Sequence, residues 1–455
     1  MIDLTLAELA TLTGGVLHGD GSIVLRGRVS VDSRAVPDGG LFAALPGEHV
    51  DGHDYVASAV AAGAAGVLAS RAVEAPCVVV DDVVAALGLM ARALIGRLGV
   101  TVVALTGSQG KTSVKDLLAH LLESQGPTVS PVGSFNNELG VPLTVLRADA
   151  STRFLVIEMG ARGAGHIATL CRIAPPDVAV VLNVGSAHVG EFGSSAAIAA
   201  AKGELVEALD AKGVAVLNAD DQRVSAMASR TSARVVTFGR TGSMRLADVH
   251  LDAAGEPSFT LTADGVTVRT HVPQVGEHQA LNAAAAAAVA IELGMPLDRV
   301  GQLLATAQAR SPLRMARSRR ADGLLVLNDA YNANPESMTA ALRALASMAG
   351  PRGVAVLGQM RELGDVSHAA HVQIGRLAAE LGIGRVVVVG DEAAGIAEGA
   401  GARAVLVADV DEAVRTLSAS LLPDEVVLVK ASRGERLERV ADALLGADAH
   451  PPRPQ

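Results

Sequence analysis

The sequence predicts an α/β protein of three domains, with a parallel sheet in the central domain and an open α/β sheet in the third. Its 455 residues exceed what one compact core supports, and domains of roughly 150 residues suggest three. Short β-branched apolar runs alternate with helical patterns along most of the chain, which is typical of parallel sheets with helices on both faces. Half of the residues are hydrophobic but only 2% are aromatic, so Ala, Val and Leu must fill the cores.

Residues 1–98 predict a small α/β domain, with an Ala-rich helix around 55–65 and a buried strand at 78–82. Residues 99–310 predict a central domain that opens with a strand at 100–105, a Gly-rich turn and a helix at 112–124. Further buried strands are expected at 154–158, 178–184 and 214–218. Residues 245–272 change to a polar-out pattern that predicts antiparallel strands at a sheet edge.

Residues 311–455 predict a third α/β domain. Its strands are expected at 324–327, 354–357, 386–389 and 426–429, with helices such as 337–348 and 372–381 between them.

Charge and cysteine content exclude several classes. The net charge is −10 and the chain has no basic run, so nucleic acid is not an expected partner. Cys77 and Cys171 cannot form a disulfide framework, and residues 1–4 show no secretory signal, so we expect a cytoplasmic protein. The Ala-rich stretch 283–291 is too short to span a bilayer, so no stable membrane association is expected. A monomer is the default expectation.

A glycine-rich turn between a predicted strand and a predicted helix carries the clearest motif. It consists of Thr106, Gly107, Ser108, Gln109, Gly110, Lys111, Thr112 and Ser113. The N–H groups of such a turn bind phosphate oxygens; the lysine is expected to reach the β and γ phosphates of ATP and the threonine hydroxyl to bind Mg²⁺. Leu105 stands where the longer motif has glycine. The alternative is an ordinary Gly-rich turn, and Lys followed by Thr-Ser at the helix start argues against it.

Lysine is rare here, since only five of the 38 basic residues are lysine. Lysine offers a compact charge and a nucleophilic amine that arginine lacks. Lys111, Lys202 and Lys430 each fall in a motif flanked by glycine or serine. Sequence drift is the alternative, and we expect it to account for Lys115 or Lys212.

Three further residues are placed to act near the turn. Glu158 ends the strand that begins at Phe154, His188 follows the next strand, and Lys202 lies on the helix after that. Ligands bind at the carboxyl edge of open parallel sheets, and a carboxylate there suits Mg²⁺. The alternatives are a helix cap or surface acid for Glu158, a structural histidine for His188 and a solvated lysine for Lys202.

Together these motifs resemble the Mur ligases, and the resemblance extends over nearly the whole chain. Its other landmarks are Asn282 and the runs 136–142, 158–160, 183–188, 201–204, 218–221, 276–278, 328–337, 357–364 and 430–433. The resemblance implies an N-terminal UDP-sugar domain, a central P-loop ATPase domain with a parallel sheet, and a C-terminal Rossmann-like domain. It also implies an ATP-dependent amide ligase of peptidoglycan precursor synthesis.

The resemblance also implies roles for individual residues. The expected catalytic residues are Lys111, His188 and Lys202. The expected Mg²⁺ ligands are Thr112, Glu158, His188 and Lys202, the last as a carbamate. Adenine and ribose would be held by Asn282, Arg314 and Asp329. Substrate contacts are expected from Ser33, Arg34, Asp51, His53, Asn136, Asn332 and Asn334.

Within the family, the runs 331–335 and 360–364 are similar to those of the member that adds a dipeptide. The chain lacks the Asp-Asn-Pro-Arg tetrapeptide usual in the member that adds diaminopimelate. The resemblance therefore implies that D-alanyl-D-alanine is joined to UDP-N-acetylmuramoyl-tripeptide through an acyl phosphate made from ATP. The third residue of the tripeptide stays open between diaminopimelate and lysine. The chain departs from the family at Gln279, often asparagine, and at Ala431, commonly glycine.

Other classes fit less well. A P-loop motor or switch would share the phosphate loop but would not account for the first 98 residues. Folylpolyglutamate synthetase begins with its ATPase domain, whereas about 100 residues precede the loop here. A non-catalytic nucleotide-binding module would have lost Lys111, Glu158 or Lys202. A Rossmann dehydrogenase needs Gly-x-Gly-x-x-Gly after a strand, which we do not find.

Overall fold

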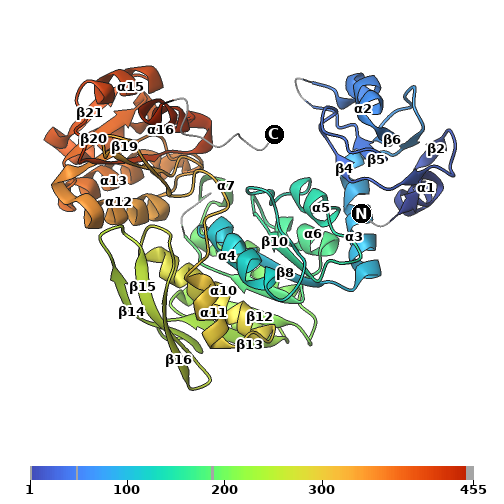
Figure 1. Cartoon of the computed structure of the whole chain (residues 1–455), viewed down its shortest axis with the longest axis horizontal. Helices are drawn as coiled ribbons and strands as arrows, with labels where there is room; N and C mark the ends of the chain where they lie inside the picture. Colours follow the sequence, from blue (N-terminus) through green and yellow to red (C-terminus); the bar gives the residue numbers. More distant parts are fainter. Residues whose placement is uncertain (1–2, 48–49, 186–188, 447–455) are drawn as a thin grey trace.

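The computed structural model describes residues 3–47, 50–185 and 189–446. Its elements form three α/β domains, with the N-terminal and C-terminal domains on opposite sides above the central one, in an open V (Figure 1). Within the described ranges, no helix is both long and apolar enough to cross a membrane. The predicted three-domain α/β class is confirmed, while the boundaries at 98 and 311 stay predictions.

The N-terminal domain has a five-stranded sheet in the order β2-β7-β6-β5-β4, parallel except for the β2–β7 pair. Its strands are β1 (Leu4–Thr5), β2 (Val16–His18), β3 (Val24–Leu25), β4 (Val29–Ser30), β5 (Gly40–Ala43), β6 (Ala64–Ala69) and β7 (Cys77–Val79). Its helices are α1 (Leu6–Thr13), the 3₁₀ turn η1 (Gly52–Tyr55), α2 (Val56–Ala62) and α3 (Val83–Leu98).

Two predictions in this domain need correction. The helix expected at 55–65 ends at Ala62, because Gly63 has φ +120° and β6 begins at Ala64. The strand expected at 78–82 ends at Val79, because the Asp82 side chain accepts the Val84 and Ala85 N–H groups and caps α3. Alanine favours helices, so the alanines at the start of β6 led the sequence prediction to extend the preceding helix into the strand.

The central domain has a nine-stranded sheet in the order β16-β15-β14-β13-β12-β11-β8-β10-β9. Its strands are β8 (Thr101–Thr106), β9 (Thr128–Val129), β10 (Phe154–Glu158), β11 (Val178–Val181), β12 (Val214–Asn218), β13 (Arg234–Gly239), β14 (Met244–Leu251), β15 (Pro257–Ala263) and β16 (Val266–His271). Only the β14–β15 and β15–β16 pairs are antiparallel, which confirms the predicted antiparallel edge. β11 is shorter than the expected 178–184.

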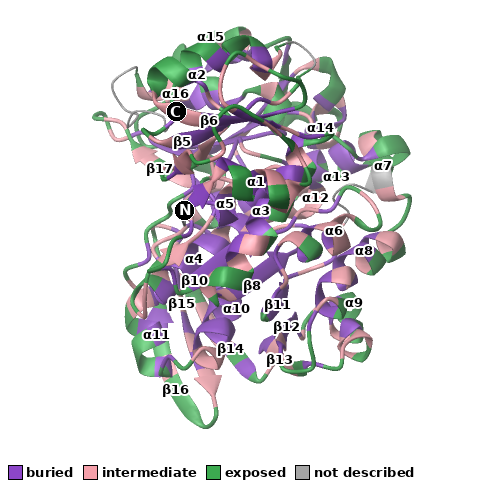
Figure 2. Cartoon of the chain, turned by 90° about the vertical axis from the view of Figure 1, so that its right-hand side faces the viewer, coloured by how far each residue is buried: buried purple, intermediate pink, exposed green. Residues whose placement is uncertain are grey.

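Helices cover both faces of this sheet, as the alternating pattern predicted. They are α4 (Lys111–Glu123), α5 (Gly140–Val145), α6 (His166–Ile173), α7 (Val189–Phe192), α8 (Ser195–Glu207), α9 (Gln222–Ser225), the 3₁₀ turn η2 (Ala226–Arg230), α10 (His278–Glu292) and α11 (Leu297–Leu304). Along β8, Val103 and Leu105 pack towards α4 and α10, whereas Val102 and Ala104 pack towards α3, α5 and α8. Figure 2 shows the buried strands β8, β10 and β11 between these layers.

The C-terminal domain has a six-stranded sheet in the order β17-β18-β22-β19-β20-β21, parallel except for the β17–β18 pair. Its strands are β17 (Ala316–Arg319), β18 (Leu325–Asn328), β19 (Gly353–Leu357), β20 (Arg385–Val389), β21 (Ala404–Val407) and β22 (Val426–Lys430). Its helices are α12 (Pro335–Ala349), α13 (Ser367–Glu380), α14 (Ala394–Ala400), α15 (Val410–Ser418) and α16 (Glu438–Leu445), with 3₁₀ turns η3 (Gly350–Arg352), η4 (Gly364–Val366), η5 (Asp391–Ala393), η6 (Gly401–Arg403) and η7 (Arg433–Glu435).

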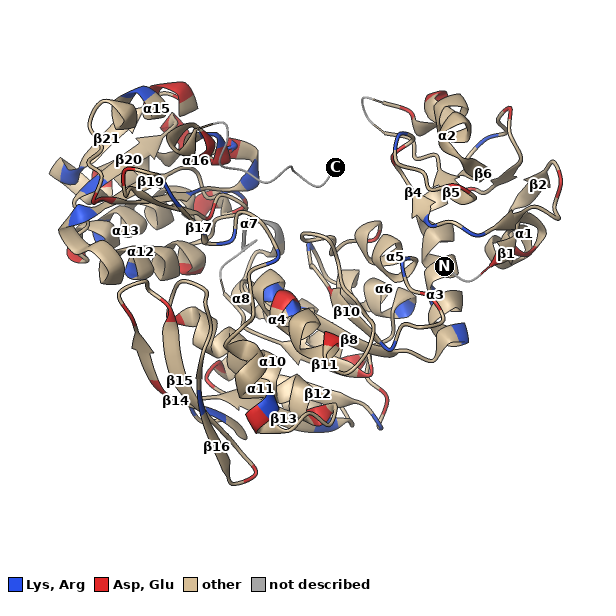
Figure 3. Cartoon of the chain, in the orientation of Figure 1, with Lys and Arg blue, Asp and Glu red and all other residues tan. Residues whose placement is uncertain are grey.

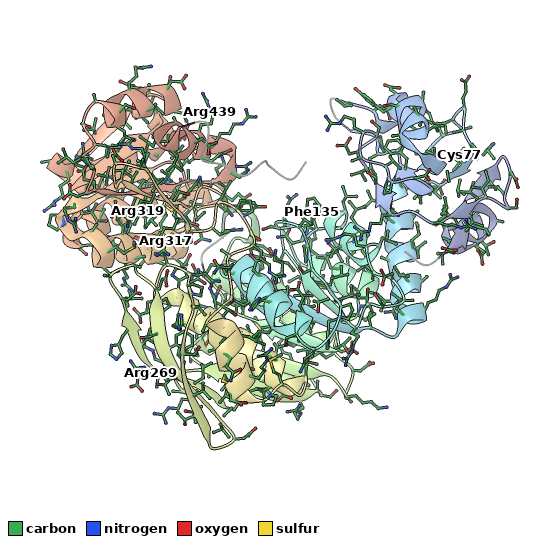
Figure 4. The ribbon with its side chains drawn as sticks, in the orientation of Figure 1. Cys77, Phe135, Arg269, Arg317, Arg319 and Arg439 are labelled. Atoms are coloured by element: carbon green, nitrogen blue, oxygen red, sulfur yellow. The ribbon has the colours of Figure 1, made fainter. Side chains whose placement is uncertain are left out.

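The C-terminal domain touches the central domain away from the linking segment. Arg317, labelled in Figure 4, pairs with Glu256 in the β14–β15 turn at 2.7 Å. The N–H of Gly190 in α7 donates to the Glu362 carbonyl at 3.1 Å. These contacts set the C-terminal domain beside the carboxyl edge of the central sheet.

Candidate active site

The phosphate-loop motif lies at the carboxyl end of β8, which pairs with β10 on one side and β11 on the other. Gly110 has φ +82°, and a Cβ there would lie 2.6 Å from Asn282 Oδ1. Only glycine fits this position, because a side chain would meet both backbone strain and a collision. The Lys111 ammonium folds back over the turn and donates to the Gly107 carbonyl at 2.7 Å.

Asn183, just beyond β11, holds the turn from the opposite side. Its side-chain oxygen accepts the Ser108 and Gln109 N–H groups, both at 3.0 Å, and its Nδ2 donates to the Gln109 carbonyl at 3.2 Å. The Gly185 N–H donates to the Ser108 hydroxyl at 2.9 Å. The turn is therefore fixed to the segment that leads towards residue 188. Sequence reasoning placed Asn183 in a motif but gave it no role.

Glu158 ends β10 beside the turn and is 1% exposed. Its Oε2 accepts the Thr112 hydroxyl at 3.0 Å and its Oε1 accepts the Asn136 amide at 2.8 Å. Thr112 Oγ1 also lies 2.8 Å from the Ser134 hydroxyl. Glu158 is therefore neither a surface acid nor a helix cap, and Ser134 is a neighbour that sequence reasoning missed because no motif marks it.

These oxygens suit a hard divalent cation. Mg²⁺ prefers carboxylate and hydroxyl oxygens together with substrate phosphates, and Thr112 and Glu158 offer such a pair next to the phosphate loop. Within the ranges that the structure describes, no group of three or more His, Cys, Asp and Glu side chains could hold a metal. His188, an expected ligand and catalytic residue, lies outside the described residues.

Lys202 lies on α8, facing inward, and is 4% exposed. It lines a cavity of about 470 Å³ together with Lys111 and Glu158. Burial, and then the charge of Lys111, lower the pKa of Lys202 well below its usual value. The solvated-lysine alternative is therefore wrong, because the side chain is buried beside Lys111 and Glu158.

The same cavity opens towards the other two domains. Its lining includes Val31 of the N-terminal domain, Phe135 of the central domain and Tyr331 of the C-terminal domain. Phe135 is 52% exposed, and Figure 4 labels it where the central domain faces the other two. A substrate bound here would contact all three domains.

Arg314 joins the phosphate loop to the C-terminal domain. Its guanidinium donates to Thr112 Oγ1 at 3.2 Å and to Ser134 Oγ at 3.3 Å, and it lies over the Tyr331 ring at 4.1 Å. The flanking residues Leu313 and Met315 have φ +60° and +50°, a strain that costs about 1–2 kcal/mol each. The adenine and ribose role expected for Arg314 stays a prediction, and its guanidinium contacts Thr112.

A second cavity, of about 140 Å³, runs from the phosphate loop to the C-terminal sheet. The expected nucleotide contacts Asn282 and Asp329 line it, with His278 and Lys430. Lys430 Nζ pairs with Asp329 at 2.6 Å and donates to the Asn332 carbonyl at 2.8 Å. Desolvation lowers the pKa of His278 to about 4, so this imidazole is neutral at pH 7.

Two expected substrate residues also line this second cavity. The Asn334 side chain caps α12 by accepting the Ser337 N–H at 2.8 Å, and its amide lies 3.5 Å from the Ser108 carbonyl. Asn332 lines both cavities. Asn334 therefore lies in the cavity beside the phosphate loop, next to the expected nucleotide contacts Asn282 and Asp329.

The N-terminal residues form a separate pocket of about 680 Å³, which Ser33 and Arg34 line. His53 lies behind it: Nδ1 contacts Asp51 Oδ1 at 2.5 Å and Nε2 accepts the Ser70 N–H at 3.0 Å. Both ring nitrogens are occupied and the His53 side chain is 1% exposed. The structure therefore gives His53 a supporting place rather than a direct contact.

Comparison with known proteins agrees with this geometry. Three family descriptions match in order: "Mur ligase family, catalytic domain" over residues 27–95, "Mur ligase middle domain" over 105–290, and "Mur ligase, glutamate ligase domain" over 313–433. The UDP-N-acetylmuramoyl-tripeptide--D-alanyl-D-alanine ligase of Mycobacterium tuberculosis (strain CDC 1551 / Oshkosh) is 46% identical, with 98% of this chain and 99% of that protein aligned.

Solved structures give the same result. A crystal structure of MurF from Acinetobacter baumannii is 32% identical with a TM-score of 0.89, covering 97% of this chain and 99% of that one. MurF ligase from Thermotoga maritima in complex with ADP is 33% identical with a TM-score of 0.81, covering 92% and 96%. Likeness of this extent in sequence and in fold shows that the chain belongs to the Mur ligase family.

Proposed function

We propose that this chain is the ATP-dependent ligase that joins D-alanyl-D-alanine to UDP-N-acetylmuramoyl-tripeptide in peptidoglycan precursor synthesis. The observation that carries the proposal is the shared wall between the two cavities. Lys111 and Arg314 line both the cavity beside Asn282 and the larger cavity beside Lys202. A nucleotide in the first and a carboxylate in the second would meet at these two cations. The full-length relatives carry this ligase name.

The chemistry begins with the terminal carboxylate of the tripeptide. A carboxylate is a poor acylating agent, because its leaving group would be oxide. Its oxygen attacks the γ-phosphorus of ATP, ADP leaves, and an acyl phosphate forms. The dipeptide amine then attacks the acyl carbon, a proton is lost, and phosphate leaves as the amide forms. Lys111 and Arg314 offset the repulsion between the two anions.

Mg²⁺ would be held by Thr112 and Glu158, with His188 and Lys202 as the further expected ligands. When bound, it neutralises phosphate charge. The Asn136 amide fixes one Glu158 oxygen and leaves the other on the Thr112 side. We propose that Arg314 serves the phosphate end of ATP, and that Asn282 and Asp329 serve the nucleoside end. Asn332 and Asn334 would contact ligand from the C-terminal domain.

Lys202 would act as a carbamate. A lysine amine in its neutral form adds to CO₂ with loss of a proton, and burial lowers the pKa of Lys202 in that direction. The product would place a carboxylate-like group in the cavity that Glu158 and Lys111 also line. Arginine cannot form this carbamate. The near-absence of lysine elsewhere in the chain is consistent with a chemical reason for keeping one here.

The N-terminal pocket would hold the uridine nucleotide. Ser33 and Arg34 line it directly, while Asp51 would shape its floor through its contacts with His53 and Arg71. We propose a cytoplasmic monomer, with the uridine nucleotide, ATP and the dipeptide as its partners.

The product of a complete reaction tests the proposal. The chain is incubated with ATP, Mg²⁺, UDP-N-acetylmuramoyl-tripeptide and D-alanyl-D-alanine, and the products are analysed by mass spectrometry. We expect the pentapeptide, and omission of the dipeptide should abolish it. If the chain instead makes product from UDP-N-acetylmuramoyl-dipeptide and a free diamino acid, it is the ligase of the preceding step, which adds the third residue. Separate incubations with the lysine and the diaminopimelate tripeptide resolve the third residue.

A further inference from the structure

A buried ion pair on α4 has no part in the proposed chemistry. Lys115 and Asp116 are 2% and 6% exposed, and Lys115 Nζ lies 2.7 Å from an Asp116 carboxylate oxygen. Lys115 Nζ also donates to the Pro131 and Gly133 carbonyls, both at 3.1 Å, and to the Ser311 hydroxyl at 3.0 Å. A buried ammonium persists only where its N–H groups have acceptors, and this one is fully engaged. Sequence drift, the alternative kept for Lys115, does not account for such an arrangement.

The Asp116 carboxylate holds the backbone where the chain leaves the central domain. It accepts the Ser311 N–H at 2.9 Å, the Arg310 N–H at 3.3 Å and the Ser311 hydroxyl at 3.1 Å. Further along α4, Glu123 receives both ends of the Arg310 guanidinium at 2.6 Å each. Figure 3 shows basic and acidic positions side by side on α4. The segment at 310–311 is therefore docked along α4 at two points.

Besides Glu158, the Thr112 hydroxyl contacts Ser134 and Arg314, and both of these follow segments that the Lys115–Asp116 pair holds. Ser134 directly follows the loop carbonyl of Gly133 that Lys115 holds, and its hydroxyl lies 2.8 Å from Thr112 Oγ1. Arg314 lies three residues after Ser311, and its guanidinium reaches the same Thr112 oxygen. Lys115 thus supports two neighbours of Thr112 from α4, the helix on which Thr112 also lies.

The segment after Ser311 is fixed at its other end as well. The Met315 N–H donates to Asp329 Oδ1 at 3.1 Å, and Asp329 pairs with Lys430 in the C-terminal sheet. Between the two anchors, Leu313 and Met315 keep positive φ angles that non-glycine residues rarely adopt. Such strain persists only where the surroundings over-determine the backbone. The hydrogen bonds at Ser311 and at Met315 hold the backbone at both ends and direct the Arg314 side chain towards the phosphate loop.

We propose that Lys115 and Asp116 are positioning residues for the ligase reaction, which fix the start of the interdomain segment to the phosphate-loop helix and thereby hold the Arg314 guanidinium against Thr112. The inference rests on the proposed function for its kinetic readout. Neither residue touches substrate; both act through Arg314 and Ser134. Their loss should therefore lower turnover while nucleotide binding persists.

The test compares Lys115→Met with Lys212→Met, the same substitution at an exposed lysine outside the network. For each full-length variant, kcat and KM for ATP are measured with the dipeptide present, and ADP affinity is measured by calorimetry. We expect Lys115→Met to lower kcat about 10- to 100-fold, since small misplacements of aligned groups have effects of that size. ADP affinity should change less than about threefold, and Lys212→Met should match the unaltered chain in all three measurements.

A double-mutant cycle separates positioning from general damage. If Lys115 acts through Arg314, Lys115→Met combined with Arg314→Lys should have nearly the kcat of Arg314→Lys alone. If the fold losses in kcat of the two single variants multiply in the double variant, the proposal is overturned. An unchanged kcat in Lys115→Met, or a loss explained wholly by weaker ADP binding, would also overturn it.

Ser311→Ala is the second variant, in case Lys115→Met does not fold. It removes only the hydroxyl that both α4 residues contact and leaves the backbone N–H for Asp116. We expect a smaller fall in kcat with ADP affinity kept, and an unchanged kcat would contradict the positioning role. Absence of dipeptide-dependent turnover in the unaltered chain would contradict the proposed function instead, so the two failures are distinguishable.

Discussion

At the scale of single residues, the polar groups of the site form hydrogen bonds with one another. Asn183 fills two N–H groups of the phosphate loop, and Lys111 donates to the carbonyl of Gly107 within the same turn. Thr112 is shared between Glu158, Ser134 and Arg314. These hydrogen bonds within the protein fix the shape of the turn, and a fixed loop reduces the ordering required on binding.

Gly110→Ala tests that preformed shape. Alanine at φ +82° costs about 1–2 kcal/mol and its Cβ would collide with Asn282. We expect ADP affinity, measured by calorimetry, to fall at least about tenfold. Gly265→Ala is the matched control, because Gly265 has φ +78° and open space around it in the β15–β16 turn. Equal ADP affinity in the two variants would contradict the assignment of the loop.

Lys202→Arg tests the carbamate. Arginine keeps a positive charge but cannot form a carbamate, so we expect kcat to fall about 100-fold or more while ADP affinity persists. Lys212→Arg, at an exposed position, should be indistinguishable from the unaltered chain. Full activity in Lys202→Arg would show that no carbamate is needed.

His278 predicts a pH dependence of stability. Its folded-state pKa is about 4 and its usual value 6.5, so between these values the unfolded chain binds more protons. Stability therefore falls as pH drops from 6.5 to 4, by at most about 1.4 kcal/mol per pH unit from this residue. Thermal unfolding of the unaltered chain at pH 7, 6 and 5 should show a steeper decline than His278→Gln. Parallel curves would contradict a neutral His278 imidazole.

At the scale of elements, α10 shows how this chain builds a core with few aromatic residues. Ala283 to Ala290 includes seven alanines and one valine, all fully buried between α4 and the central sheet. Small side chains let two helices and a sheet approach closely, which brings Asn282 to the phosphate loop. The composition predicted an alanine-filled core, but not which helix would carry it.

Ala286→Leu should overfill this layer. We expect a loss of about 1–3 kcal/mol in the free energy of unfolding, because Ala286 is 0% exposed and three extra carbons in a packed core force strain. Chemical denaturation measures the loss. Ala196→Leu on α8, at an exposed position, is the control and should change stability by less than about 0.5 kcal/mol. Equal stability of the two variants would contradict tight packing of α10.

At the scale of the whole molecule, local patterns predicted the elements and missed the long-range partners. The α/β class and the positions of β10, β12 and α4 follow from periodicity and from a turn motif within the chain. The burial of Lys115 follows from Ser311, 196 positions away, and Arg314 reaches Thr112 from 202 positions away. No local pattern encodes such pairs. The partner of His53 was missed for the same reason, since its Nε2 accepts the N–H of Ser70, just beyond the end of β6.

The open V of the three domains predicts a closing movement. Water would destroy an acyl phosphate, so the domains should approach when ATP and the tripeptide substrate are bound. Small-angle scattering should show a smaller radius of gyration with a non-hydrolysable ATP analogue and the tripeptide than with neither. An unchanged radius of gyration would contradict domain closure and would mean that the reaction takes place in the open arrangement of the domains.

The central claim is that the phosphate loop serves an amide ligase that needs its acceptor. The most direct measurement is phosphate release from ATP and Mg²⁺ with UDP-N-acetylmuramoyl-tripeptide, in the presence and absence of D-alanyl-D-alanine. The account predicts strong release only when the dipeptide is present. Release at the same rate without the dipeptide would contradict it and would identify a plain nucleotide hydrolase.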